Sequence, residues 1–185
     1  MASVTIRHAE AGDVARIAAL HATAWRETYR GLLPEAVIAA HDQAACATIW
    51  RARLEAPPPG ASLLLVEGEE GAAGPLLAFG ACGPRRDAAL PFPGEFEALY
   101  VLRRAQRAGI GRALMRRMAA ALLEAGIDAA GLWVLRANLA ARAFYTELGG
   151  TLVAARENPA LGAAEVAYAW RDLRLLAAAS RRPEG

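Results

Sequence analysis

The chain has 185 residues, a length that fits one domain with a sizeable hydrophobic core. Its formal net charge is +2, and all 21 basic residues are arginine without a dense basic run, which argues against a dedicated nucleic-acid-binding protein. No apolar stretch approaches the about 18 to 20 residues that span a bilayer, and residues 1–13 lack a signal-peptide pattern. We therefore expect a cytoplasmic protein with neither a membrane nor a nucleic-acid partner.

The two cysteines, Cys46 and Cys82, lie in separate segments without the spacing of metal ligands. His41 is the only histidine near either of them in the sequence. We expect two reduced, packed thiols and no metal site.

The first third of the chain predicts one strand and two helices. The strand covers Val4 to Arg7, and Asp13 is placed to cap a helix whose apolar face runs from Val14 to about Trp25. The second helix runs from Pro34 to about Leu54 and is followed by a turn cluster at residues 57–60. Because the segment before this cluster has no sheet of its own to cover, we expect it to pack on the later strands within a single domain, residues 1–176.

The rest of the chain alternates short apolar runs with two helical patterns, which is typical of an α/β protein. The helices run from about Gly111 to Ala125 and from Leu139 to Leu148, and each is followed by glycine. Residues 177–185 carry no apolar pattern and are expected to be a disordered tail. The predicted strands are Ser62 to Glu67, Leu76 to Cys82, Phe96 to Leu102, Gly131 to Leu135, Thr151 to Ala155 and Val166 to Asp172.

The junction at residues 106–111 predicts an anion site at the start of a helix. No Ser, Thr, Asp or Asn occurs between Leu102 and Leu114 to cap the helix amides. Gly109 and Gly111 allow a ligand to approach the backbone, and the helix dipole with Arg107 and Arg112 favours negative charge such as a pyrophosphate. The alternative is a plain glycine turn capped by water.

Two other phosphate-binding loops are excluded by pattern. A Walker loop requires Gly-Lys-Ser/Thr, and this chain has no lysine. The dinucleotide fingerprint requires a third glycine where Leu114 stands. A nucleotide-dependent enzyme is therefore disfavoured.

The segment Gln106-x-x-Gly109-x-Gly111 resembles the Arg/Gln-x-x-Gly-x-Gly/Ala signature of the GNAT superfamily of acyl-CoA-dependent N-acyltransferases. A second segment, which runs from Asn138 through Ala141 and Phe144-Tyr145 to Gly149, is similar to the family's other cofactor-facing segment. Residues 21–34 also resemble a bacterial branch of the superfamily, so the likeness covers nearly the whole chain. The chain departs from the family pattern at two positions. Ala108 stands where a basic residue or glycine is common, and Gly150 stands where an aromatic residue is common.

The resemblance implies a mixed sheet of six or seven mostly antiparallel strands, splayed between the fourth and fifth and flanked by about four helices. It implies acetyl-CoA as cosubstrate and direct attack by an amine within a ternary complex. Main-chain groups near Leu99, Tyr100 and Val101 would hold the thioester carbonyl. The remaining cofactor-binding residues that it implies are Gln106, Arg107, Ala108, Gly109, Ile110, Gly111, Arg112, Asn138, Ala141 and Phe144.

Strand geometry selects candidates for the catalytic base. Residues two apart on a strand share a face, so Glu95, Glu97 and Leu99 are expected to point the same way. Glu95 is our first choice, because it lies eleven positions before Gln106, where related enzymes commonly carry a catalytic glutamate. Glu97 is the second choice. The alternative places both in a solvated loop before the strand.

Tyr145 is the candidate proton donor to the departing CoA thiolate, because thiol and tyrosine pKa values of about 8.5 and 10 are close enough for transfer in a positioned pair. The alternative is that its ring only packs beside Phe144. Asn138 either caps the last helix or hydrogen-bonds pantetheine, and the two roles are compatible.

The acceptor amine stays open at this stage. Two glutamates favour a cation such as a polyamine, an aminoglycoside or a peptide amine, whereas Arg26 and Arg30 would suit an amino acid with a carboxylate. The second candidate function is a CoA-binding regulatory protein without turnover. Whether the chain forms a homodimer is also open.

Overall fold

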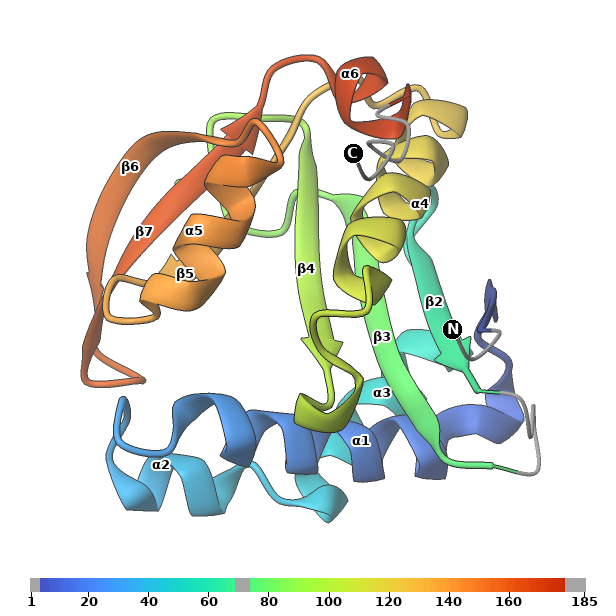
Figure 1. Cartoon of the computed structure of the whole chain (residues 1–185), viewed down its shortest axis with the longest axis vertical. Coiled ribbons are helices and arrows are strands. Elements are labelled where there is room, and N and C mark those ends of the chain that lie inside the picture. Colours follow the sequence, from blue (N-terminus) through green and yellow to red (C-terminus); the bar gives the residue numbers. More distant parts are fainter. Residues whose placement is uncertain (1–3, 69–73, 179–185) are drawn as a thin grey trace.

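A seven-stranded sheet organises the chain in the computed structural model, which describes residues 4–68 and 74–178 (Figure 1). The strand order is β1-β2-β3-β4-β5-β7-β6, and every neighbouring pair is antiparallel except β4 with β5. This arrangement confirms the predicted mixed sheet. The strands are β1 (Thr5–His8), β2 (Ser62–Glu67), β3 (Leu76–Pro84), β4 (Gly94–Val101), β5 (Ala130–Leu135), β6 (Thr151–Asn158) and β7 (Ala163–Trp170).

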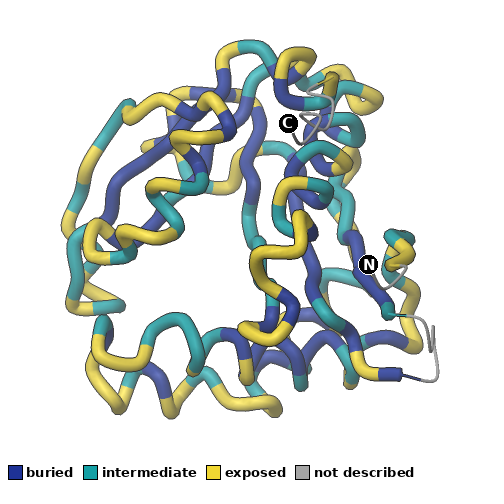
Figure 2. Tube along the Cα trace, viewed as in Figure 1, coloured by how far each residue is buried: buried dark blue, intermediate teal, exposed yellow. Residues whose placement is uncertain are grey.

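Helices cover both faces of the sheet. The helices α1 and α3 pack on one face around Ile17, Trp50 and Phe79, and α4 packs on the other around Leu114 and Met118. In Figure 1 the carboxyl end of β4 points toward α1, and Figure 2 shows buried positions along the strands. The helices are α1 (Val14–Tyr29), α2 (Glu35–Ala40), α3 (Gln43–Glu55), α4 (Ile110–Glu124), α5 (Leu139–Glu147) and α6 (Leu173–Ala178), with short 3₁₀ turns at Ala11–Asp13 and Arg103–Ala105.

The number of helices differs from the expected four, because the described residues contain six. The helix predicted from Pro34 to Leu54 is divided at residues 41–42, where the Asp42 carboxylate accepts a hydrogen bond from the Ala45 amide and starts α3. The sixth helix, α6, packs Leu173 and Leu176 into the core. Residues 177 and 178, expected to belong to the tail, are therefore part of α6. The rest of the expected tail, residues 179–185, lies outside the described residues.

Asp13 precedes α1 as predicted, but its carboxylate does not cap that helix. It accepts hydrogen bonds from the Glu10 amide and from both terminal nitrogens of Arg7. Arg7 on β1 also donates a hydrogen bond to Glu67 on β2, so the Asp13 carboxylate binds the arginine that links these two strands.

The sheet opens between β4 and β5, as predicted. Only two residue pairs join these strands, Gly94 with Ala130 and Glu95 with Gly131. From Phe96 to Val101, no described residue pairs with β4 on its β5 side, and Figure 1 shows the two strands diverging there. Among the described residues, this edge of the β4 backbone is therefore unpaired.

A β-bulge interrupts β4 at Glu97. Phe96 pairs with Cys82 and Ala98 with Ala81, so Glu97 has no partner residue on β3. Beyond the bulge, Leu99 packs against the α4 side of the core, whereas Ala98 and Tyr100 pack against the α1 side. The prediction that Leu99 shares a face with the two glutamates is therefore wrong, because the extra residue reverses the alternation.

Both cysteines are buried and free. Burial raises the pKa of the Cys46 thiol to about 11 and that of Cys82 to about 12. These values are those of inert, packed thiols rather than nucleophiles.

Candidate active site

The start of α4 presents backbone amides without acceptors. Arg107 and Gly109 have positive φ angles of 64° and 80°, and no side chain caps the helix at Gly109. In the part of the chain that the structure describes, no carbonyl accepts a hydrogen bond from the amides of residues 107–112, and the first helical bond runs from Ala113 to Gly109. The predicted lack of a cap is confirmed. Such a helix start, with positive charge from its dipole, suits an anion.

The two segments of the GNAT resemblance meet at Gly111. A Cβ atom at this position would lie 3.3 Å from Cζ of Phe144 and 3.9 Å from Cγ2 of Val101, so α4, α5 and the end of β4 come together there. Asn138 caps α5 by accepting a hydrogen bond from the Ala141 amide. The Gln106 side chain donates to the Val101 carbonyl, which fixes the loop against β4.

A pocket of about 540 Å³ lies at the opening between β4 and β5. It is bordered by α1, the loop between β3 and β4, and strands β4 to β7. Five aromatic residues line it, together with both candidate glutamates: Trp25, Tyr29, Phe96, Tyr100, Trp133, Glu95 and Glu97. A larger hollow of about 650 Å³ lies between the start of α1 and α3, but none of the predicted catalytic or cofactor-binding residues lines it.

Both glutamates lie within β4 and not in a solvated loop. The side chains of Glu95 and Glu97 are 8% and 4% exposed. Arg86 occupies both oxygens of Glu95, since its amide and its Nη2 each donate over 2.8 Å. Glu97 pairs through Oε2 with Arg53, and with Nε of Arg86 at 3.5 Å.

The two carboxylates differ in their free hydrogen-bonding capacity. No described residue donates to Oε1 of Glu97, whereas both oxygens of Glu95 accept. Burial raises the pKa of Glu97, and the nearby Arg86 and Arg53 offset part of this effect. A raised pKa and an open oxygen are properties of a proton acceptor.

The far end of the pocket is closed by a second ion-pair group. Arg156 binds Asp87 and Glu165, and its guanidinium lies 3.9 Å from the centre of the Trp133 ring. Asp87 and Arg86 are adjacent in the β3–β4 loop, so this loop is tied to both sides of the pocket.

Tyr145 lies on α5 and is 8% exposed. Its ring packs against Phe144, Tyr168 and Trp170, with centroid distances of 5.4, 6.0 and 6.1 Å. Burial raises the pKa of Tyr145, with a smaller contribution from Tyr29. Its phenol is therefore fully protonated at neutral pH.

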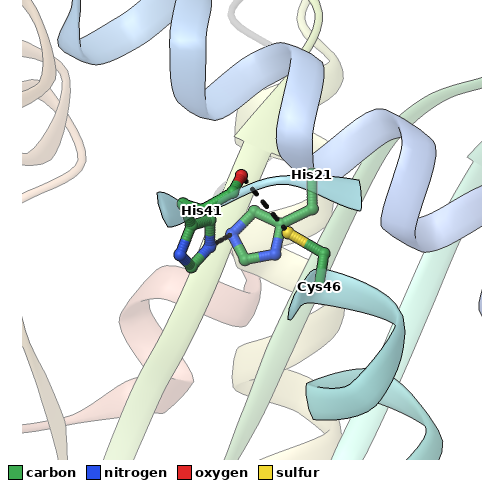
Figure 3. Close-up of side chains that lie close together, drawn as sticks. All are labelled: His21, His41 and Cys46. Atoms are coloured by element: carbon green, nitrogen blue, oxygen red, sulfur yellow. Dashed lines mark hydrogen bonds between the residues drawn. The ribbon is translucent and has the colours of Figure 1, made fainter. Parts of the chain in front are cut away.

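Beside the pocket, the structure brings together a group that the sequence spacing did not indicate: His21, His41 and Cys46, with ligand atoms within 4.8 Å of one another (Figure 3). The Trp50 indole donates to Nδ1 of His21, which places the His21 proton on Nε2, 3.2 Å from Nε2 of His41. A metal on His21 Nε2 would require a proton on Nδ1, opposite the Trp50 donor. The donor set therefore suits a hydrogen-bonded pair of neutral rings better than a metal, and burial lowers the pKa of His21 to about 3.

Arg53, Arg86 and Arg156 are site residues that the sequence analysis missed. Each contacts a pocket carboxylate, yet single arginines carry little information in a chain whose 21 basic residues are all arginine. The run Arg85-Arg86-Asp87, which precedes the paired glutamates in the sequence, is the one signal that could have indicated Arg86.

Within the described ranges, no helix has the length and apolar character needed to cross a membrane.

Comparisons with known proteins agree with this geometry. The model of the Acetyltransferase (GNAT) family matches residues 17–150. The chain is 30% identical over 175 residues to YuaI of Bacillus subtilis (strain 168), described as an uncharacterized N-acetyltransferase, with 94% of this chain and 96% of that protein covered.

Solved structures show the same fold at lower identity. PaiA N-acetyltransferase of Thermoplasma acidophilum, in complex with coenzyme A, is 17% identical with a TM-score of 0.68, and the match covers 90% of this chain and 98% of that one. The yncA protein of Salmonella typhimurium, with its cofactor acetyl-CoA, is 19% identical with a TM-score of 0.66 and 98% coverage of both chains. The chain therefore belongs to the GNAT family, which confirms the predicted class of enzyme, an N-acetyltransferase.

Proposed function

We propose that the chain transfers an acetyl group from acetyl-CoA to a primary amine of a small molecule or peptide by direct attack in a ternary complex. The observation that carries this proposal is the pair of features on either side of the open β4 edge. The uncapped start of α4 lies toward one face, and the acidic, aromatic pocket lies toward the other. Two substrates could therefore meet at β4 from opposite sides.

The proposed cofactor site uses the loop from Gln106 to Arg112. Its unpaired amides would bind the pyrophosphate, and the unpaired edge of β4 near Leu99, Tyr100 and Val101 would bind pantetheine. An N–H group on this edge would hold the thioester oxygen as charge develops on it. The neighbours solved with coenzyme A and acetyl-CoA support the choice of cosubstrate.

In the proposed reaction the amine nitrogen attacks the thioester carbon, and the carbon–sulfur bond then breaks. The amine proton passes to a glutamate, and the leaving sulfur receives a proton from Tyr145. Of the two glutamates, the contacts favour Glu97 over Glu95, because one Glu97 oxygen receives no hydrogen bond from the described residues and the pKa of Glu97 is raised. Burial raises the pKa of Tyr145, and the same burial would disfavour a thiolate placed beside it, so that proton transfer between the two would remain feasible.

A turnover screen tests the proposal. Acetyl-CoA is incubated with a panel of monoamines, diamines, aminoglycosides, amino acids and peptide N-termini, and free thiol and acetylated product are followed together. We expect product from at least one class. Failure with every class, combined with tight CoA binding, would instead favour a CoA-binding regulatory protein.

The proposed compartment is the cytoplasm, in keeping with two free, buried cysteines.

A further inference from the structure

The guanidinium of Arg86 lies against two carboxylates that the pocket buries. It donates to Oε1 of Glu95 over 2.8 Å, and its Nε lies 3.5 Å from Oε2 of Glu97. The carboxylates belong to a strand and are at least nine-tenths buried, but the Arg86 side chain is 53% exposed and belongs to a loop. A fixed anionic site is thus filled by a solvent-exposed cation from the chain itself.

Both carboxylates keep a donor when the Arg86 side chain leaves. Glu95 retains the backbone amide of Arg86 at 2.8 Å, and Glu97 retains Arg53. Two carboxylates and one remaining guanidinium give a local charge of −1, because one positive charge offsets one of the two negative charges. A single cation with several N–H donors satisfies this site, and an alkylammonium has that chemistry.

The surroundings of the guanidinium also suit an amine with a hydrocarbon body. The pocket next to Glu95 and Glu97 is lined by the rings of Trp25, Tyr29 and Tyr100. Aromatic faces attract cations and bury methylene groups. A carboxylate on the acceptor, in contrast, would meet Glu95 and Glu97 as soon as Arg86 moved.

We propose that Arg86 holds the position of the acceptor's ammonium group, and that the enzyme selects cationic alkylamines that displace the Arg86 side chain from Glu95 and Glu97. This inference rests on the proposed function and names the substrate class of its acceptor site. Arg86 is thus a specificity-determining residue. It keeps two buried carboxylates paired until an acceptor replaces it.

Replacement of Arg86 tests the inference with butylamine and 1,4-diaminobutane as cationic acceptors and L-alanine as an acceptor with a carboxylate. In Arg86→Ala we expect KM for both alkylamines to fall about two- to fivefold with little change in kcat, because no ion pair has to be broken first. Arg86→Met, which keeps an unbranched apolar side chain without the charge, should behave alike. Arg117→Ala removes the same charge from an exposed site on α4 and should leave every KM unchanged.

A binding measurement makes the test independent of turnover. Methylguanidinium chloride carries the same group as the Arg86 side chain, so at millimolar concentration it should raise the Tm of Arg86→Ala but not of the wild type, relative to equal sodium chloride. A higher KM for L-alanine alone in Arg86→Ala would overturn the inference, because Arg86 would then bind the acceptor's carboxylate. Unchanged alkylamine KM values with no effect of methylguanidinium would also overturn it.

The inference and the proposed function fail in different ways. If no amine is acetylated but methylguanidinium stabilises Arg86→Ala, the proposed reaction is wrong and the cation site stands. If amines are acetylated and Arg86→Ala follows the wild type in both measurements, the reaction stands and the role of Arg86 is wrong.

Discussion

The Tyr145 side chain combines a packed ring with a hydroxyl that forms no hydrogen bond with the described residues. The ring is part of the core between α5 and β7. Removal of the hydroxyl alone therefore separates its chemistry from its packing.

We expect Tyr145→Phe to lower the rate of acetyl transfer by about 10²- to 10⁴-fold, the usual contribution of a general acid. Affinity for CoA should stay nearly intact, because the ring that packs beside Phe144 is kept. Steady-state kinetics at saturating substrates and calorimetric titration with CoA measure the two effects. A rate within about threefold of the wild type would mean that the tyrosine only packs and that the thiolate leaves without its help.

The two glutamates should respond differently to replacement by glutamine. Glu97→Gln should lower turnover most at low pH, where the amine is protonated and needs a base, and turnover should recover partly as the pH rises and free amine accumulates. Glu95→Gln should chiefly raise KM, because the acceptor site loses one of the two carboxylates that would replace Arg86 by the ammonium group, whereas the proposed base, Glu97, is kept. A pH series of kcat and kcat/KM on both variants distinguishes the roles. A larger loss of kcat in Glu95→Gln would restore Glu95 as the base.

At the scale of single residues, the sequence indicated the two glutamates, the tyrosine and the loop at residues 106–111 as candidates, because each belongs to a local pattern. It did not identify their partners. Arg53 lies 44 positions from Glu97, and no periodicity relates a helix residue to a carboxylate on a distant strand. The difference between Glu95 and Glu97 depends on such contacts, and so it could not be predicted.

Among the elements, β4 carries the most information about the site. Its apolar pattern predicted a strand, but the bulge at Glu97 depends on register with β3, which the pattern of one strand does not contain. The bulge turns Glu97 toward the α1 face together with Ala98. The split between α2 and α3 is different, since Asp42 is a capping residue that could have been recognised from the sequence.

The junction of β1, α1 and β2 depends on one buried carboxylate. Hydrogen bonds from Arg7 lower the pKa of Asp13 to about 2, against the opposing effect of burial. Because the folded pKa lies below the ordinary value of 3.8, the stabilisation is fully present above about pH 4 and is lost as the pH falls toward 2.

We expect Asp13→Asn to reduce the free energy of unfolding by about 2 kcal/mol at pH 7, as a pKa shift of this size implies. The difference from the wild type should shrink below pH 4 and nearly vanish at pH 2. Urea unfolding between pH 2 and 7 measures it. Asp128→Asn, at an exposed position, is the matched control. A difference that stays constant with pH would mean that shape and not charge explains the loss.

At the scale of the whole molecule, the sheet consists of two parts joined at two residue pairs of β4 and β5. The β1–β4 part carries the amides of α4, and the β5–β7 part carries α5, which meets α4 at Gly111 and Phe144. A cofactor that lies along the open edge of β4 would contact both parts. Its binding should therefore affect amides on both sides of the opening, far apart in the sequence.

We expect CoA to slow hydrogen exchange at residues 107–112, whose amides have no acceptor among the described residues, and at residues 99–101 on the open edge of β4. At about 100 times its Kd, CoA should also stabilise the fold by about 2.7 kcal/mol. Exchange in α3, on the opposite face, should not change. Mass spectrometry of the exchanged protein with and without CoA measures all three.

Gly109→Val is the variant that ties this protection to the proposed site. Its φ of 80° strains a β-branched residue, and its Cβ points into open space with nothing within 4 Å, where the pyrophosphate would lie. The side chain would therefore obstruct the ligand rather than the core, and the variant should fold with a modest loss of stability but show no slowing by CoA. If CoA protects residues 107–112 in Gly109→Val as in the wild type, the pyrophosphate binds elsewhere. If CoA slows exchange only in the β5–β7 part of the sheet, the cofactor binds to that part instead.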